Sequence, residues 1–192
     1  MTTYPMRTRR WTRAEYDRLI EVGAFAPGDP VELLGGELIV SEPQGSRHYT
    51  ALCLVEDALR AAFGPGWVIR SQGPVALDEE SEPEPDVAVV RGSPRDYSGE
   101  HPSRPVLVVE VAESSLRLDR EHKGNLYARA HLEDYWIVNL VEGVLEIYRE
   151  PVADPSATYG WRYASQIVLG LEASATPLAA PTVSIAVRAL LP

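Results

Sequence analysis

The sequence predicts a mixed α/β fold (α+β), in which one mixed β-sheet is flanked by α-helices. Segments with helical and with strand periodicity follow one another in the order helix, hairpin, helix, strands, helix, strands. The nearly continuous apolar run Val106–Val111 is typical of a central strand that is covered on both faces. No internal repeat or linker divides the chain, so we expect a single domain over residues 1–192, with a flexible N-terminal arm over residues 1–10.

Local signals predict the individual elements. Thr12 and Glu15 form a capping box and Gly23 can end a helix, which together indicate a helix over residues 13–22. Gly35-Gly36 separates two short apolar runs and can take positive φ at both turn positions, which indicates a hairpin. The same criteria predict a helix from after Ser46 to about Ala62, a helix over about 119–131, and strands over 31–34, 37–40, 67–70, 75–77, 86–90, 106–111, 135–139, 144–149, near 161–164 and near 183–187.

Composition restricts the class of protein. The chain has 192 residues with 18 basic and 28 acidic side chains, a net charge of −10, and 45% hydrophobic residues, which is typical of a folded protein and not of a disordered chain. A single cysteine, Cys53, excludes an internal disulfide framework and indicates a reducing cytoplasm. No stretch has the pattern of a signal peptide or a membrane span, so we expect a cytoplasmic protein without a membrane partner.

The acidic stretch Asp78–Asp86 contains six carboxylates in nine residues. We interpret its first five acids as a solvated loop. Asp86 differs from them, because it follows Pro85 and opens an apolar strand. Glu110 interrupts the apolar run Val106–Val111, where a charge is costly unless it is paired or binds a metal. Two carboxylates at the ends of adjacent strands indicate a site for a hard divalent cation such as Mg²⁺.

Lys123 is the third candidate. It lies 13 residues after Glu110 on the predicted helix, with Tyr127 one turn later on the same face. A lysine beside a metal-bound water can hold that water and stabilise charge that develops on a phosphate. Each residue alone also has an ordinary structural interpretation: Lys123 as a surface lysine, Glu110 as an ion-pair partner, and Asp86 as a turn residue.

Four motifs together resemble the Uma-two family, a group of bacterial endonucleases with the restriction-endonuclease-like fold of the PD-(D/E)XK superfamily. The resemblance extends from the hairpin to the end of the chain and is specific as a set. The motifs are Pro85-Asp86, Val108–Val111, the segment Lys123–Tyr127, and Asp134–Val138.

The resemblance implies that Asp86 and Glu110 ligate Mg²⁺, with Mn²⁺ as a substitute, and that the backbone carbonyl of Val111 is a third metal contact. The lysine of the superfamily normally stands two residues after the glutamate, where this chain has Ala112. The resemblance therefore implies that the lysine has moved to the following helix, at Lys123.

The resemblance also suggests outer members of the site. Glu32 or Glu37 in the hairpin would add an acid, and His48 opens the second helix at a position where family members often carry histidine. A purely structural role is as compatible with the sequence for all three, because hairpin acids and histidines at helix starts are common.

The leading functional hypothesis is a metal-dependent endonuclease that hydrolyses DNA phosphodiester bonds, with the metal held by Asp86 and Glu110 and with Lys123 assisting. Cleavage of a duplex favours a homodimer with two active sites. One alternative is a catalytically inactive nuclease-fold module that binds or regulates. Another is a glycoside hydrolase, which needs two acids roughly 5–10 Å apart and no lysine.

Overall fold

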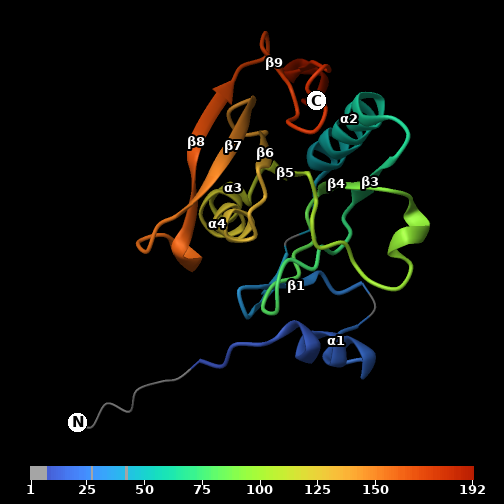
Figure 1. The fold of residues 1–192 in the computed structure, drawn as a ribbon, viewed down its shortest axis with the longest axis vertical. Coiled ribbons are helices and arrows are strands. Elements are labelled where there is room, and N and C mark those ends of the chain that lie inside the picture. The colour runs from blue at the N-terminus through green and yellow to red at the C-terminus, as the bar shows by residue number, and fades with distance from the viewer. Residues whose placement is uncertain (1–7, 27, 42) are drawn as a thin grey trace.

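The computed structural model of the chain describes residues 8–26, 28–41 and 43–192. Its largest element is a six-stranded mixed sheet with the strand order β3-β4-β5-β6-β7-β8 (Figure 1). Strands β5 and β6 are parallel, and every other neighbouring pair in this sheet is antiparallel. The strands are β3 Trp67–Ser71, β4 Val87–Arg91, β5 Leu107–Ala112, β6 Asp134–Asn139, β7 Val144–Ala153 and β8 Trp161–Leu169.

Helices and two small sheets surround this central sheet. The helical segments are α1 Arg13–Glu21, α2 Ser46–Phe63, the single turn α3 Leu116–Leu118, the π-helix Asp119–Lys123, α4 Gly124–Arg129, and 3₁₀ turns at Pro94–Tyr97, Thr158–Gly160 and Val187–Ala189. The small sheets pair β1 Val31–Leu34 with β2 Glu37–Val40, and β9 Ser174–Ala175 with β10 Ile185–Ala186.

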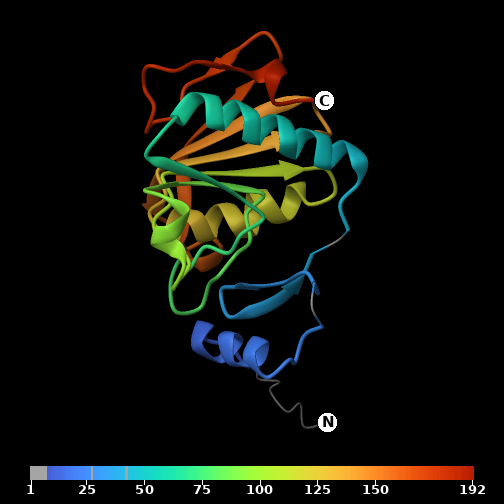
Figure 2. The ribbon, with the colours of Figure 1, turned by 90° about the vertical axis from the view of Figure 1, so that its right-hand side faces the viewer.

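The two faces of the central sheet are covered by different helices (Figure 2). Helix α2 and the C-terminal segment pack on one face, where Leu59, Val109 and Trp136 belong to one hydrophobic cluster. The α3–α4 segment packs on the other face, where Val108 and Tyr127 belong to a second cluster. Every residue of β5 is buried. The predicted fold class, and the central strand covered on both faces, are therefore confirmed.

Local sequence signals are confirmed at α1 and at the β1–β2 hairpin. The backbone N–H of Glu15 donates to Thr12 Oγ at 3.3 Å, and the N–H of Thr12 donates to Glu15 Oε2 at 3.1 Å. The turn glycines Gly35 and Gly36 have φ of +56° and +83°. The predicted N-terminal arm falls largely on residues 1–7, which lie outside the described residues.

The predicted helix over 119–131 is replaced by three consecutive helical pieces, which begin at Leu116 and end at Arg129. The Gly124 N–H donates to the Asp119 carbonyl, which is the i+5 pattern of a π-turn. Tyr135 Oη donates to the same carbonyl at 3.0 Å. The parallel β5–β6 pair needs a crossover connection, and this helical segment supplies it.

Three other predictions need correction. Residues 75–77 form no strand: the Val75 N–H donates to the Pro83 carbonyl, outside any ladder of the central sheet. The C-terminal strand is limited to Ile185–Ala186. The acidic stretch is not a solvated loop throughout, because Glu82 is buried and its N–H donates to the Leu33 carbonyl of β1 at 2.8 Å. We call residues 78–84 the acidic strap.

Helix length and hydrophobicity bear on a membrane location. Across residues 8–26, 28–41 and 43–192, none of the helices combines the length and the apolar character that spanning a bilayer requires.

Candidate active site

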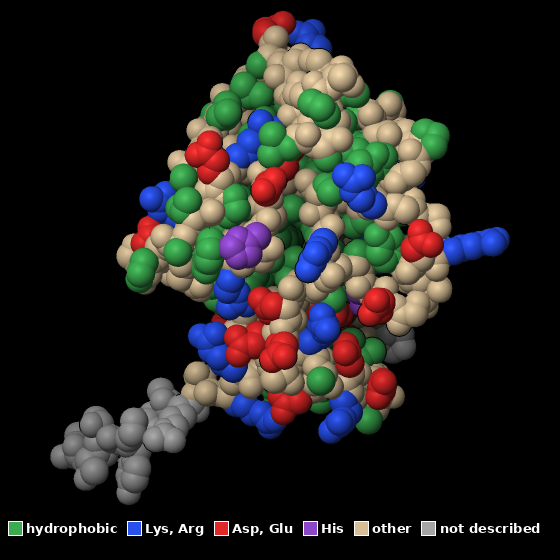
Figure 3. All heavy atoms as spheres, in the orientation of Figure 1, with side chains coloured by type: hydrophobic (Ala, Val, Ile, Leu, Met, Phe, Trp, Pro, Cys, Tyr) green, Lys and Arg blue, Asp and Glu red, His purple; other side chains and the backbone are tan. Residues whose placement is uncertain are grey.

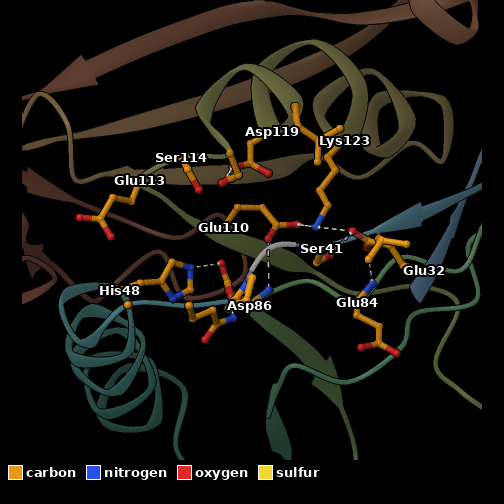
Figure 4. A pocket seen from close by; sticks show the side chains of 16 residues that line it. Glu32, Ser41, His48, Glu84, Asp86, Glu110, Glu113, Ser114, Asp119 and Lys123 are labelled. Carbon is orange, nitrogen blue, oxygen red and sulfur yellow. Dashed lines mark hydrogen bonds and ion pairs between the residues drawn. The ribbon is translucent and has the colours of Figure 1, made fainter. Parts of the chain in front are cut away.

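A cavity of about 360 Å³ lies between the β1–β2 hairpin, the start of α2, the strands β4 and β5, and the π-helix (Figure 4). Five of the side chains that the sequence marked as site candidates line it: Asp86, Glu110, Lys123, Glu32 and His48. The structure therefore brings together residues that are separated by up to 91 positions in the chain.

Asp86 and Glu110 meet because β4 and β5 are neighbours in the sheet. Their register pairs Val87 with Val109, which places the residue before β4 next to Glu110. The Asp86 N–H donates to Glu110 Oε2 at 3.2 Å, and the Val111 N–H donates to Asp86 Oδ2 at 2.7 Å. The Glu110 carboxylate is thus fixed by the backbone N–H of Asp86, and the Asp86 carboxylate is fixed by the backbone of β5.

The Val111 backbone enters the site through its N–H. Val111 is not one of the residues that line the cavity. Its carbonyl as a metal contact stays a prediction.

Lys123 reaches the cavity from the π-helix. Its Nζ lies 3.3 Å from Glu110 Oε1 and 3.4 Å from Glu32 Oε1, and the residue is 6% exposed. Lysine occurs once in the 192 residues, since the other 17 of the 18 basic side chains are arginines. The single lysine of the chain therefore lies buried between two carboxylates. Its occurrence as the only lysine distinguishes Lys123 independently of the sequence motifs.

Glu32 is held by contacts from three directions. Ser41 Oγ donates to Glu32 Oε1 at 3.2 Å, the Glu84 N–H of the acidic strap donates to Oε2 at 3.0 Å, and Lys123 completes the set. Glu37, the other acid of the hairpin, is exposed and does not line the cavity. Of the two hairpin acids, Glu32 is the one that contacts the site.

His48 contacts Asp86 from the first turn of α2. Its Nε2 lies 3.3 Å from Asp86 Oδ2, while its Nδ1 is buried and has no hydrogen-bond partner among the described residues. The carboxylate of Asp86 favours a proton on Nε2. Burial lowers the pKa of His48, but the hydrogen bond and the charge of Asp86 outweigh burial and leave the pKa above its ordinary value.

Burial dominates the electrostatics of the cavity. It raises the pKa of Glu110 to about 8, against the attraction of the Lys123 ammonium. Burial also opposes the charge on Lys123, yet the surrounding carboxylates, Glu110 first, hold its pKa well above the ordinary range. Tyr127 Oη donates to Glu110 Oε1 at 2.7 Å, so Glu110 accepts hydrogen bonds or an ion pair on both oxygens. The Lys123 ammonium is the positive charge that pairs with Glu110 and Glu32.

Asp119 is a cavity residue that the sequence interpretation missed. It stands four residues before Lys123, is 2% exposed, and accepts a hydrogen bond from Ser115 Oγ at 2.6 Å. Burial raises its pKa to about 6, against the attraction of Lys123. The spacing of four residues on one helix could have indicated that Asp119 and Lys123 share a face. The predicted helix began at Asp119, so this residue was not assigned to a face.

The donor set of the cavity fits a hard divalent cation. Four buried carboxylates, from Glu32, Asp86, Glu110 and Asp119, face one ammonium, so negative charge is in excess. Within the part of the chain that the structure describes, no group of three or more His, Cys, Asp or Glu side chains is arranged to hold a metal ion. Mg²⁺ is usually bound through one or two carboxylates and keeps several waters, so an open carboxylate pair suits it.

The fold of the chain is shared with a solved structure. A crystal structure of "a putative nuclease belonging to DUF820" from Anabaena variabilis matches with a TM-score of 0.66 over 90% of this chain and 96% of that chain, at 16% sequence identity. Residues 13–188 match the Uma2 family, described as "Putative restriction endonuclease", and the chain belongs to this family. The resemblance stated from the sequence motifs is thereby confirmed. No functionally curated protein matches the chain.

Proposed function

We propose that this protein is a metal-dependent endonuclease that hydrolyses DNA phosphodiester bonds. The observation that carries the proposal is the Lys123 ammonium, which Glu110 and Glu32 hold in the same cavity as Asp86. The family description and the name of the solved neighbour support a nuclease activity. A buried lysine among carboxylates can also stabilise the charge that develops on a phosphate during hydrolysis.

Each side chain then has a role. Asp86 and Glu110 would hold Mg²⁺, with Mn²⁺ as a substitute, and such an ion polarises a phosphoryl oxygen and lowers the pKa of water when bound. Lys123 orients the attacking water and stabilises the charge that develops on the phosphate. Glu32 fixes the ammonium from the hairpin side, and His48 fixes Asp86 from α2.

The charge of the protein makes substrate binding depend on cations. The chain carries a net charge of −10, and in Figure 3 acidic and basic side chains are intermixed over the lower part of the visible face, where α1 and β1 lie in Figure 1. A cavity with excess carboxylates repels a phosphate until cations neutralise it. We therefore propose that DNA enters together with divalent ions, and that a homodimer presents two such cavities to the two strands of a duplex.

Cleavage of supercoiled plasmid in the presence of Mg²⁺ or Mn²⁺ tests the proposal. Asp86→Asn and Glu110→Gln are expected to abolish cleavage, as is removal of the ion by a chelator, while thermal melting shows an intact fold. Glu37→Gln is the matched control, because this exposed acid of the hairpin lies outside the cavity. A double variant of Asp86 and Glu110 that cuts as fast as the parent would refute the mechanism.

A second function, an inactive nuclease-fold module, is favoured by one observation. The oxygens of Asp86 and Glu110 already accept contacts from Val111, His48, Tyr127 and Lys123, so the cluster is partly neutralised by the protein itself. Calorimetry separates the two functions. A module of this kind would bind neither Mg²⁺ nor Mn²⁺ at millimolar concentration but would still retard DNA in a gel.

The Lys123 variant also tests the glycoside hydrolase alternative. Lys123→Ala would leave a glycosidase unaffected, whereas the nuclease loses rate.

A further inference from the structure

Arg120 lies on the π-helix between two cavity residues, Asp119 and Lys123, but its guanidinium contacts the central sheet. Its Nε lies 3.0 Å from Glu146 Oε2 and its Nη2 lies 2.6 Å from Glu146 Oε1, a two-point contact with β7. Glu146 is fully buried. The segment that supplies the site lysine is therefore attached to the sheet by a two-point ion pair.

Glu146 is fixed on all sides. Asn139 Nδ2 donates to its Oε1 at 2.7 Å, and Tyr148 Oη donates to its Oε2 at 2.7 Å. With the two bonds from Arg120, each carboxylate oxygen accepts two hydrogen bonds, which is the full capacity of a carboxylate. A buried carboxylate with all its hydrogen bonds made is held in one position. Because Arg120 is bonded to it, the π-helix that carries Arg120 is restrained as well.

We infer that Arg120 is a positioning residue for Lys123. Its ion pair with Glu146 holds the π-helix in the conformation that places the Lys123 ammonium between Glu110 and Glu32. The inference rests on the proposed function and deepens it. Arg120 contacts neither Lys123 nor the carboxylates that pair with Lys123, so its effect on the reaction must pass through the backbone of the π-helix.

The π-helix gives such an anchor a purpose. A π-turn is a one-residue insertion into an α-helix and is less favourable than the α-helical turn that it replaces. Its relaxation would move the following residues by about one helical position, which is roughly 1.5 Å along the axis and 100° around it. Lys123 would then lose Glu110 and Glu32. Besides Arg120, Tyr135 Oη fixes this turn at the Asp119 carbonyl.

The same sheet offers a matched control. Arg149 of β7 pairs with the fully buried Asp134 through Nε and Oδ1 at 2.8 Å, and its Nη2 donates to the Thr176 carbonyl. This second arginine–carboxylate pair joins β6, β7 and the C-terminal segment and makes no contact with the π-helix. Loss of either arginine leaves a buried carboxylate short of its partner, so the two variants carry a similar kind of damage to stability.

The first experiment compares Arg120→Met with Arg149→Met in plasmid cleavage at saturating Mg²⁺, below the melting temperature of both. Misplacement of a catalytic group by about 1 Å can lower a rate by about 100-fold, so kcat of Arg120→Met is expected to fall by about that factor, with KM little changed. Arg149→Met is expected to retain kcat. Equal kcat in the two variants would overturn the inference. If Arg120→Met does not fold, Glu146→Gln takes its place.

A double-variant cycle identifies the path of the effect. If Arg120 acts through Lys123, Arg120→Met lowers the residual rate of Lys123→Ala by much less than it lowers the rate of the parent. An equal loss in both backgrounds would mean that Arg120 acts independently of the lysine, and would refute a positioning role.

A readout that needs no catalysis uses the single lysine. Acetylation by an amine reagent at fixed pH, read by peptide mass spectrometry, reports one side-chain amine in this chain. Lys123 is expected to react slowly in the parent and in Arg149→Met, and several times faster in Arg120→Met. Unchanged labelling would contradict the inference. If Lys123→Ala cleaves like the parent, the proposed function fails, while the labelling result still decides whether Arg120 positions the lysine.

Discussion

Replacement of Glu82 by glutamine is expected to stabilise the protein at neutral and alkaline pH, and less so as the pH falls. Glu82 belongs to the acidic strap, and its side chain is 5% exposed. Its nearest cation is Arg13, whose Nε lies 3.9 Å away, and its carboxylate accepts no hydrogen bond from the described residues. Burial, followed by the charge of Asp17, raises the pKa of Glu82 from 4.5 to about 7, against the attraction of Arg13.

The direction of the effect follows from proton linkage. Because the pKa is higher in the folded chain than in the unfolded chain, the stability contributed by this group is fully present below about pH 4.5 and is lost as the pH rises through about 7. Over the whole titration, the contribution of Glu82 to the free energy of unfolding changes by roughly 3 kcal/mol, since one pKa unit corresponds to about 1.4 kcal/mol. Between about pH 5.5 and about pH 8.5 the parent should lose about 2 kcal/mol relative to Glu82→Gln.

Urea denaturation at several pH values measures this difference. The free energies of unfolding of the parent and of Glu82→Gln are compared at each pH, so that any constant effect of the amide cancels. Glu79→Gln is the control, because Glu79 lies in the same strap and is exposed. A difference between parent and Glu82→Gln that stays constant across the pH range would refute the reasoning, since the carboxyl would then titrate alike in both states.

Two further substitutions test the supports of the cavity. Gly35→Ala is expected to lower the free energy of unfolding by about 1–3 kcal/mol in urea denaturation, because φ is +56° and a Cβ would overlap the Tyr159 ring. Gly143→Ala is the control, because φ is +68° and the space around this glycine is open, so only backbone strain should lower its free energy of unfolding. Equal losses of stability in the two variants would show that the overlap with Tyr159 contributes nothing. Tyr127→Phe removes the donor to Glu110 and should cost about 1–3 kcal/mol by the same measurement; unchanged stability would show that the hydrogen bond contributes nothing.

The parts of the fold that local signals determine were predictable from the sequence. The capping box at Thr12 and the Gly35-Gly36 turn need only neighbouring residues, and both are confirmed. The run Val106–Val111 indicated a central strand because only a sheet covered on both faces accepts such a sequence. The strand pairing beyond the hairpins depends on contacts between distant residues, which no local signal specifies.

The residues near Asp78 show where local reasoning fails. Alternating acids and prolines are typical of a solvated loop, but backbone groups of the strap are paired with the hairpin. The Glu82 N–H donates to the Leu33 carbonyl at 2.8 Å, and the Glu80 carbonyl accepts from the Gly36 N–H at 2.7 Å. Glu82 is buried as a result of that docking, and no pattern within the strap indicates it. A tertiary contact has overridden composition here.

The candidate site was partly predictable. Asp86 and Glu110 are each anomalous in an apolar context, and the structure places both at one cavity. Asp119 was missed because the predicted helix began at this residue, so its spacing of four residues from Lys123 was not used to place both on one face. Arg120 and Glu146 gave no signal at all, since a buried ion pair between a helix and a strand cannot be distinguished from two surface charges by sequence.

The parallel pairing of β5 and β6 has an evolutionary consequence. Antiparallel strands can be joined by two residues, whereas parallel strands need a connection of about a dozen or more, so relatives cannot delete this helical segment without losing the sheet. Glu32 instead arrives on a separate ribbon outside the six strands. The hairpin is not needed for the pairing within the six-stranded sheet, so changes in it can reshape the cavity next to Glu32 while the residues on the obligatory crossover stay in place.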